Sequence, residues 1–265
     1  RDTELNRDVA IKVLPEAASN DPQRLERFNR EIHTVAGLSH PNIVEIFDFD
    51  EADGRPYYLM AYFVNNLRHM IGESNHPDEP SRPLRVDKAL HYTRQTLQGL
   101  ACLHYAGIVH RDIKPANMMF NPEGHIVLTD FGIAYIVGGV RFTMSGAISG
   151  TPAYMSPEQA RGEEVDRQSD IFSFGVLAYE LVLNRSPFRG DSISALFYAI
   201  AHQEPEPVQE VWPGCPPALA ACIKPLITSL AVPSPPTATT VLYPFPPASA
   251  ASLIACPGYS VNSTS

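Results

Sequence analysis

Residues 110–117 read His-Arg-Asp-Ile-Lys-Pro-Ala-Asn, and residues 130–132 read Asp-Phe-Gly. Together, these two segments hold the groups that phosphoryl transfer requires. Asp112 can orient a hydroxyl nucleophile, and Lys114 can offset negative charge on a phosphoryl group in transfer. Asn117 and the aspartate of the second segment offer the oxygen ligands that Mg²⁺ prefers. Either tripeptide alone would mean little, whereas both in this order form a specific signature.

Three further segments accompany this pair along the chain. Residues 9–12 read Val-Ala-Ile-Lys, residues 150–158 read Gly-Thr-Pro-Ala-Tyr-Met-Ser-Pro-Glu, and residues 166–175 read Asp-Arg-Gln-Ser-Asp-Ile-Phe-Ser-Phe-Gly. With them, the chain resembles the eukaryotic-type (Hanks-type) serine/threonine protein kinase family, and its bacterial branch most closely. The resemblance covers roughly Arg1 to Lys224.

The resemblance implies an α+β fold with two lobes, in which a small antiparallel β lobe with one helix precedes a mainly helical large lobe. We expect an incomplete small lobe over residues 1–63, a large lobe over residues 64–224 and an uncharged Pro/Ala/Thr-rich tail, irregular in structure, over residues 225–265. The implied reaction is transfer of the ATP γ-phosphoryl group to serine or threonine hydroxyls of protein substrates in signalling. Mg²⁺ and autophosphorylation belong to the same expectation.

By resemblance, the polar residues of these segments have separate roles in this reaction. Asp112 is the catalytic base or hydroxyl-orienting group, and Lys114 argues for serine/threonine rather than tyrosine specificity. Thr151 would hydrogen-bond both of them and brace the substrate hydroxyl. Asp130 would bridge the metal and the phosphates, and Asn117 would hold a second metal ion.

The nucleotide site is expected to draw on the Val-Ala-Ile-Lys strand and on a hinge over residues 60–64. Lys12 would contact the α and β phosphates, held by an ion pair with Glu31. Taken alone, Lys12 would be a solvated lysine at a strand end, and Glu31 would belong to a solvated helix face. The residues expected to enclose the adenine, or to lend it backbone groups, are Ala10, Met60, Ala61, Phe63 and Met119.

Arg111, beside the catalytic aspartate, suggests regulation, because such an arginine can receive a phosphate from the activation segment. Thr143 and Ser145 are the hypothesised phosphosites, and the alternative is that both are ordinary loop hydroxyls. His110 is interpreted as a packed structural histidine beneath Phe131.

The apolar pattern predicts the elements that carry these segments. Residues 9–13 are apolar and partly β-branched, as in a buried strand, and Asp21-Pro22 predicts the start of a helix. Apolar residues at helical spacing follow it: Leu25, Phe28, Ile32, Val35 and Leu38. The other expected elements are strands over 43–49 and 57–64 joined by a turn at Asp53-Gly54, a loop over 72–83, a helix over 86–105 with Leu90, Leu97, Leu100 and Leu103 along one side, a strand over 126–128 and a buried helix over 171–183. Val35 and Ile46 would join His110 and Phe131 in a column resting on Asp170, although plain core positions explain these two residues equally well.

The composition excludes several classes of protein. The formal net charge of −9 and the pI near 5.4 argue against nucleic acid as a partner, because such binders carry basic surfaces. The four cysteines are scattered without a CxxC pair, which indicates reduced thiols in a cytoplasmic protein. No uncharged apolar run of about 18 residues predicts a membrane segment, although a full-length form could be anchored. Homodimers, formed for autophosphorylation in trans, are a further expectation.

Both ends depart from the family pattern. Only eleven residues precede Lys12 and none is glycine, so the family's glycine-rich phosphate loop is missing and ATP binding should be weak. After Lys224 there is no charged residue and no histidine, and no arginine follows Arg189 to pair with Glu158. A buried carboxylate stripped of its partner would cost about 3–5 kcal/mol. We expect a truncated N-terminus and an aberrant, frameshift-like C-terminal end rather than a natural linker.

Two other interpretations compete with an active kinase. The first is a catalytically impaired kinase-like fragment or a pseudokinase-type module that binds partners. The second is a damaged gene product without a function of its own. Retention of Lys12, Asp112, Asn117 and Asp130 argues against a dedicated pseudokinase. A glycine-rich loop in frame upstream of Arg1 would favour the enzyme.

Overall fold

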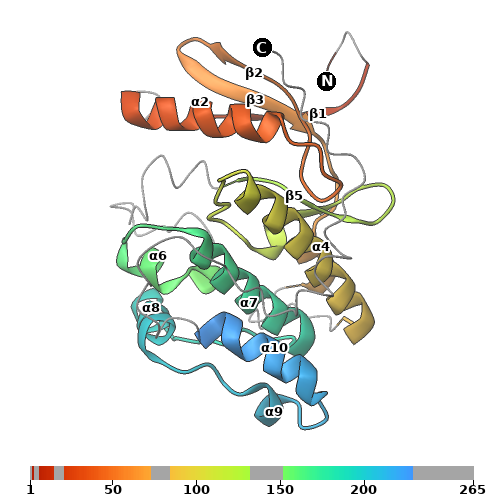
Figure 1. Ribbon diagram of the computed structural model, residues 1–265, viewed down its shortest axis with the longest axis vertical. Coiled ribbons are helices and arrows are strands. Elements are labelled where there is room, and N and C mark those ends of the chain that lie inside the picture. The colour runs from red at the N-terminus through yellow and green to blue at the C-terminus, as the bar shows by residue number, and fades with distance from the viewer. Residues whose placement is uncertain (1, 3–5, 15–20, 73–83, 132–151, 229–265) are drawn as a thin grey trace. The chain divides into compact units, whose positions relative to one another are not determined.

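An antiparallel sheet with one long helix is followed by a mainly helical lobe, so the protein has a mixed α+β fold (Figure 1). The computed structural model describes residues 2, 6–14, 21–72, 84–131 and 152–228. All of these residues belong to one compact unit, Arg1–Leu230. The predicted fold class is confirmed.

The sheet consists of β1 (Val9–Val13), β2 (Ile46–Ala52) and β3 (Arg55–Ala61) in the order β1-β3-β2, with antiparallel neighbours. Between β2 and β3, Asp53 and Gly54 adopt φ angles of 52° and 73°. Two successive positive φ angles are typical of a type I′ turn, whose twist matches that of the flanking strands. The predicted turn and the bounds of the predicted first strand are confirmed. The predicted burial of that strand is wrong, because Ile11 is 59% exposed and Val13 is 44% exposed.

The segment before β2 leaves the sheet, although the sequence predicts a strand from residue 43. Ile43 forms a parallel bridge with Leu128 of β5 (Ile126–Leu128), and Val44 N–H donates to the Leu128 carbonyl at 2.9 Å. β3 likewise ends at Ala61 rather than at residue 64. Ile43 and Val44 are apolar and β-branched, as a strand of the same sheet would be, so the sequence pattern could not reveal that they pair with a strand far along the chain.

Helix α2 (Pro22–Ala36) begins where the sequence predicts. Asp21 Oδ1 accepts a hydrogen bond from Gln23 N–H at 3.1 Å, and Pro22 occupies the first helical position, where its missing N–H would have had no helical partner. The helix packs against β2. Its fully buried side chains are Phe28, Ile32 and Val35, with Leu25 partly buried beside them.

The helical lobe is organised around α7, which is buried along most of its length. Its elements are α3 (Leu67–Ile71), α4 (Val86–Tyr105), η1 (Pro115–Asn117), β4 (Met118–Phe120), β5, η2 (Pro152–Tyr154), α6 (Pro157–Arg161), α7 (Arg167–Leu183), α8 (Ile193–His202), α9 (Val208–Val211) and α10 (Pro217–Thr228). Because α7 is apolar on nearly all sides, it needs cover on all sides, and α4 and α10 pack against it (Figure 1). Within the described part of the chain, none of the helices combines the length and the apolar character needed to cross a membrane.

The helix predicted over residues 86–105 and the strand over 126–128 have the expected bounds, but the buried face of α4 differs at its start. Leu90 is 44% exposed, whereas Leu100 and Leu103 are buried. Near its N-terminal end, α4 instead buries Ala89, Tyr92 and Thr93. The expected leucine stripe is therefore wrong at Leu90.

Helix α10 continues past Lys224, so the expected irregular tail does not begin at residue 225. Pro225 lies inside the helix, where it removes one backbone hydrogen bond. Burial offsets this loss, because Ile227 is buried where α10 crosses α7. Gly175 of α7 permits the close crossing, since a Cβ there would lie 2.7 Å from Ile227 Cγ2. Residues 229–265 lie outside the described part of the chain.

Glu158 is not the stranded carboxylate that the sequence predicts. It is half-buried at the start of α6, and its Oε1 accepts a hydrogen bond from Ser169 Oγ of α7. A hydroxyl donor in α7 therefore satisfies this carboxylate without an arginine, and the expected penalty of an unpaired buried charge does not apply.

Candidate active site

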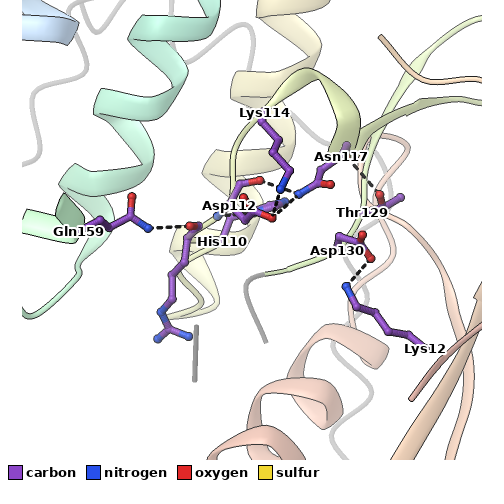
Figure 2. A network of polar contacts seen from close by, with 9 residues as sticks. Lys12, His110, Asp112, Lys114, Asn117, Thr129, Asp130 and Gln159 are labelled. Carbon is purple, nitrogen blue, oxygen red and sulfur yellow. Dashed lines mark hydrogen bonds and ion pairs between the residues drawn. The ribbon is translucent and has the colours of Figure 1, made fainter. Parts of the chain in front are cut away.

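Asp112 accepts hydrogen bonds from two side chains of its own loop. Lys114 Nζ lies 2.8 Å from Asp112 Oδ2, and Asn117 Nδ2 lies 2.8 Å from the same oxygen and 2.9 Å from the Asp112 carbonyl (Figure 2). The Lys114 cation and the Asn117 amide thus fix the direction of a carboxylate whose side chain is 44% exposed. An oriented carboxylate that stays in contact with solvent can accept a proton from an incoming hydroxyl.

The loop that carries Asp112 rests on a buried aspartate of α7. Asp170 is 1% exposed, and its carboxylate accepts the backbone N–H groups of His110 and Arg111, both at 2.7 Å. The same carboxylate lies 2.7 Å from His104 Nε2 of α4. Asp170 therefore joins the loop of residues 110–117, called the catalytic loop below, to the helices α4 and α7. The predicted column was expected to rest on this aspartate.

His110 packs beneath Phe131, as the sequence predicts. Its side chain is fully buried, and the two ring centroids lie 5.4 Å apart at an interplanar angle of 59°. Burial lowers the pKa of His110, which favours the neutral imidazole. Because Asp112 N–H donates to His110 Nδ1 at 3.3 Å, the ring proton belongs on Nε2. His110 therefore occupies the position of a packed interior histidine.

Two residues of this region adopt left-handed backbone conformations without being glycine. Arg111 has a φ of 67° and Asp130 has a φ of 59°. Such angles commonly cost about 1–3 kcal/mol and persist where neighbouring contacts hold them, often at functional sites. Around Asp130, Thr129 N–H and Oγ1 both donate to the Asn117 carbonyl, at 3.0 and 3.2 Å. This pair of bonds ties the residue before Asp130 to the end of the catalytic loop.

Lys12 contacts Asp130, and Glu31 contacts Arg111, so the predicted Lys12–Glu31 ion pair is wrong. Lys12 Nζ of β1 lies 2.6 Å from Asp130 Oδ1 (Figure 2). Arg111 Nη1 donates to both carboxylate oxygens of Glu31 in α2, each at 3.0 Å. Asp130 and Glu31 each pair with a cation. Lysine and arginine are both chemically suitable partners for a carboxylate, so the tertiary arrangement decides which cation each carboxylate contacts.

Three of the residues predicted to enclose or contact adenine lie on the neighbouring strands β1 and β3, namely Ala10, Met60 and Ala61. Ala10 and Met60 are register partners across β1 and β3. Beyond β3, Asn66 bridges to Met119 of β4, which brings β4 next to the segment that follows the hinge. Ala61 and Phe63 are partly buried against the same hydrophobic core. Ala10 and Met60 thus lie side by side on the strand pair that carries Lys12. Thr143, Ser145 and Thr151 lie outside the described residues.

Nothing in the sequence pattern indicates the buried hydrogen-bond network among Arg68, Tyr154 and Glu180. Arg68 Nη1 of α3 lies 3.1 Å from Glu180 Oε1 of α7, and both side chains hydrogen-bond the Tyr154 hydroxyl of η2. Burial, and then the charge of Glu180, raises the pKa of Tyr154. Each of these residues alone resembles an ordinary surface or core position, so only the fold identifies them as a cluster.

The oxygen-rich side of the site suits a magnesium–nucleotide complex. Asn117 gives its amide hydrogens to Asp112, which leaves its side-chain oxygen as the atom that a metal could bind. Asp130 supplies a carboxylate, and Lys12 beside it supplies a cation for phosphate oxygens. Hard oxygen donors next to a lysine are the groups that Mg²⁺ and phosphates prefer.

Comparisons with known proteins agree with this geometry. The protein kinase domain family matches residues 1–237. A probable serine/threonine-protein kinase of Streptomyces coelicolor is 40% identical over 84% of this chain and 33% of its own length. Serine/threonine-protein kinase PknA of Mycobacterium tuberculosis is 38% identical over 88% of this chain and 52% of its own length. PknB of Mycolicibacterium smegmatis is 40% identical over 78% of this chain and 33% of its own length. The chain spans from a third to about half of the length of these relatives, and it belongs to the protein kinase domain family, in its bacterial Hanks-type branch.

Proposed function

We propose that this chain transfers the γ-phosphoryl group of ATP to serine and threonine hydroxyls of protein substrates. The observation that carries the proposal is the Asp112 carboxylate, which Lys114 and Asn117 hold in one direction. Thr129, the residue before Asp130, also donates to the Asn117 carbonyl. Phosphoryl transfer depends mainly on positioning and electrostatics, and this arrangement supplies both. The relatives' names give the same activity to proteins that share most of this domain.

The residues of the site divide the work of this reaction. Asp112 would orient the substrate hydroxyl and accept its proton, and Lys114 would offset charge on the phosphoryl group as it moves. Asn117 and Asp130 would hold Mg²⁺, and Lys12 would bind the phosphates. When bound, Mg²⁺–ATP would supply the phosphoryl group and neutralise part of its charge.

Two groups of neighbours would complete the site. Glu31 would position α2 beside Arg111, and Thr151 would brace the substrate hydroxyl. The residues proposed to enclose or contact the adenine are Ala10, Met60, Ala61, Phe63 and Met119. Their gathering on β1, β3, β4 and the segment after β3 supports this assignment.

The test is Mg²⁺-dependent incorporation of the ATP γ-phosphate into this chain and into a mixed serine/threonine peptide substrate. Asp112→Asn should lower the rate by about 10²–10⁴-fold, because it removes the proton acceptor while keeping the shape. Asp191→Asn, the same change at an exposed site before α8, is the matched control and should leave the rate unchanged. Folded, soluble chain that incorporates no phosphate would contradict the proposal and favour an impaired kinase-like binding module.

Regulation through Arg111 is part of the proposal. A phosphate on Thr143 or Ser145 would compete with Glu31 for the Arg111 guanidinium, which Glu31 occupies at 3.0 Å. A doubly charged phosphate attracts a guanidinium more strongly than a carboxylate does, so phosphorylation would release Glu31. Phosphopeptide mapping of an active preparation checks this point, and finding both hydroxyls unmodified would refute it.

The remaining proposals concern the setting of the domain. The division into a small lobe over residues 1–63 and a large lobe from residue 64 is supported by the sheet and α2 in the first and by the α7-centred helices, which run to Thr228, in the second. A cytoplasmic location is supported by free thiols at Cys215 and Cys222. Homodimers for autophosphorylation in trans are proposed from family resemblance. Sedimentation equilibrium of the chain, with and without ATP, tests the dimer.

A further inference from the structure

Gln159, a residue of α6 outside the motifs described above, hydrogen-bonds the catalytic loop directly. Its side chain is 4% exposed, and Nε2 donates to the Arg111 carbonyl at 2.8 Å (Figure 2). At its other end, Oε1 accepts the Ser156 backbone N–H at 3.0 Å. Only one orientation of the amide places its oxygen against an N–H and its nitrogen against a carbonyl, so the chemistry fixes the assignment.

The capping of α6 does not by itself require glutamine. Ser156 Oγ accepts the Gln159 backbone N–H at 3.3 Å and the Gln159 side chain returns to Ser156 N–H, which together form a capping box. Glutamate serves this motif as well as glutamine does. A glutamate here would, however, point a carboxylate oxygen at the Arg111 carbonyl, where the structure has a donor. The contact with Arg111 therefore accounts for an amide at this position.

The Arg111 carbonyl belongs to the peptide group that joins Arg111 to Asp112. The N–H of this peptide group donates to His110 Nδ1, so both of its ends are held, the carbonyl by Gln159 and the N–H by His110. The preceding N–H, that of Arg111 itself, is held by Asp170. Because Arg111 has a φ of 67°, its backbone favours relaxation toward an ordinary conformation, and a rotation of this peptide group would turn the Asp112 side chain.

We infer that Gln159 is a positioning residue for phosphoryl transfer, which holds the Arg111–Asp112 peptide group and makes the direction of Asp112 depend on α6. Helix α6 follows η2 (Pro152–Tyr154) within a few residues, so a displacement of that segment moves Gln159 relative to the loop. The inference rests on the proposed function, in which Asp112 orients the substrate hydroxyl. It adds a residue that acts through Asp112 rather than by touching the substrate.

The test compares two variants of the full chain. Gln159→Glu keeps the capping contacts and removes the donor to Arg111. We expect kcat to fall by about 10- to 100-fold, as for a slightly misplaced catalytic group, with the KM for ATP unchanged because Lys12 and Asp130 are not touched. Ser156→Ala is the matched control: it removes the hydroxyl half of the capping box and leaves the Gln159–Arg111 bond, so it should lower the unfolding temperature without lowering kcat.

Backbone hydrogen exchange gives a readout that does not depend on activity. In Gln159→Glu, the amides of residues 110–114 should exchange faster, whereas in Ser156→Ala they should not. Unchanged exchange and kcat in Gln159→Glu would overturn the inference, as would an equal loss of kcat in both variants. If Gln159→Glu fails to fold, Gln159→Met supplies the same comparison without the added charge. If the unaltered chain transfers no phosphate, the proposed function fails, and exchange alone still decides whether Gln159 holds the loop.

Discussion

Replacing Asp170 by asparagine should destabilise the protein severely, although the two side chains have nearly the same shape. The carboxylate accepts three hydrogen bonds of 2.7 Å in a site that is 1% exposed, from His110 N–H, Arg111 N–H and His104 Nε2. Asparagine has one acceptor oxygen. If that oxygen keeps the two bonds of Oδ2, the Arg111 N–H is left facing an NH₂ group.

The magnitude follows from these contacts. A buried donor without an acceptor costs about 1–3 kcal/mol, and each of the two remaining bonds loses roughly 1 kcal/mol when its acceptor is no longer charged. The free energy of unfolding of Asp170→Asn should therefore fall by about 3–5 kcal/mol. In a domain of this size, where 1 kcal/mol lowers Tm by about 2–4 °C, the midpoint should drop by roughly 10 °C.

Urea unfolding followed by circular dichroism, together with a thermal scan, measures this effect. Asp166→Asn is the matched control, because it makes the same chemical change at the exposed N-cap of the same helix, where Asp166 Oδ1 accepts Gln168 N–H at 2.7 Å. Asparagine caps helices as well as aspartate does, so this variant should match the unaltered chain. An Asp170→Asn variant as stable as Asp166→Asn would refute the reasoning, because it would mean that the buried carboxylate does not hold the loop.

Two other predictions concern packing and pH. Gly99→Ala should lower the free energy of unfolding by about 1–3 kcal/mol, because its Cβ would lie 2.8 Å from the Asn42 carbonyl and from Leu128 Cδ1. Gly37→Ala, whose Cβ would meet nothing closer than 3.5 Å, should show no such loss, and equal denaturation midpoints for the two variants would contradict the argument. Burial lowers the pKa of His110, so below about pH 6.5 the unfolded chain binds more protons than the folded chain. Stability should then fall with decreasing pH, by at most about 1.4 kcal/mol per pH unit from this group, and His110→Gln should remove that part of the slope in urea titrations at several pH values.

The sequence predicts well those elements whose causes are local. Asp21 and Pro22 start α2, and the apolar spacing after them defines its buried face, because capping and helical periodicity involve residues only a few positions apart. The same holds for the turn at Asp53-Gly54, where two residues that tolerate positive φ occur together. The order and spacing of the short motifs likewise predict the family, and they make Asp112, Asn117 and Asp130 candidate site residues.

Tertiary structure alone decided the partners of these residues. Lys12 forms an ion pair with Asp130 and not with Glu31, and Glu31 forms one with Arg111. Glu158 accepts a hydrogen bond from the Ser169 hydroxyl. Hydrogen-bonding and charged groups are chemically interchangeable to a large extent, so a sequence states what each residue can bind but not what the packing brings within about 3 Å. Gln159 shows the same division: its capping contacts with Ser156 are local, three positions apart, whereas its bond to the Arg111 carbonyl exists only because α6 packs against the catalytic loop.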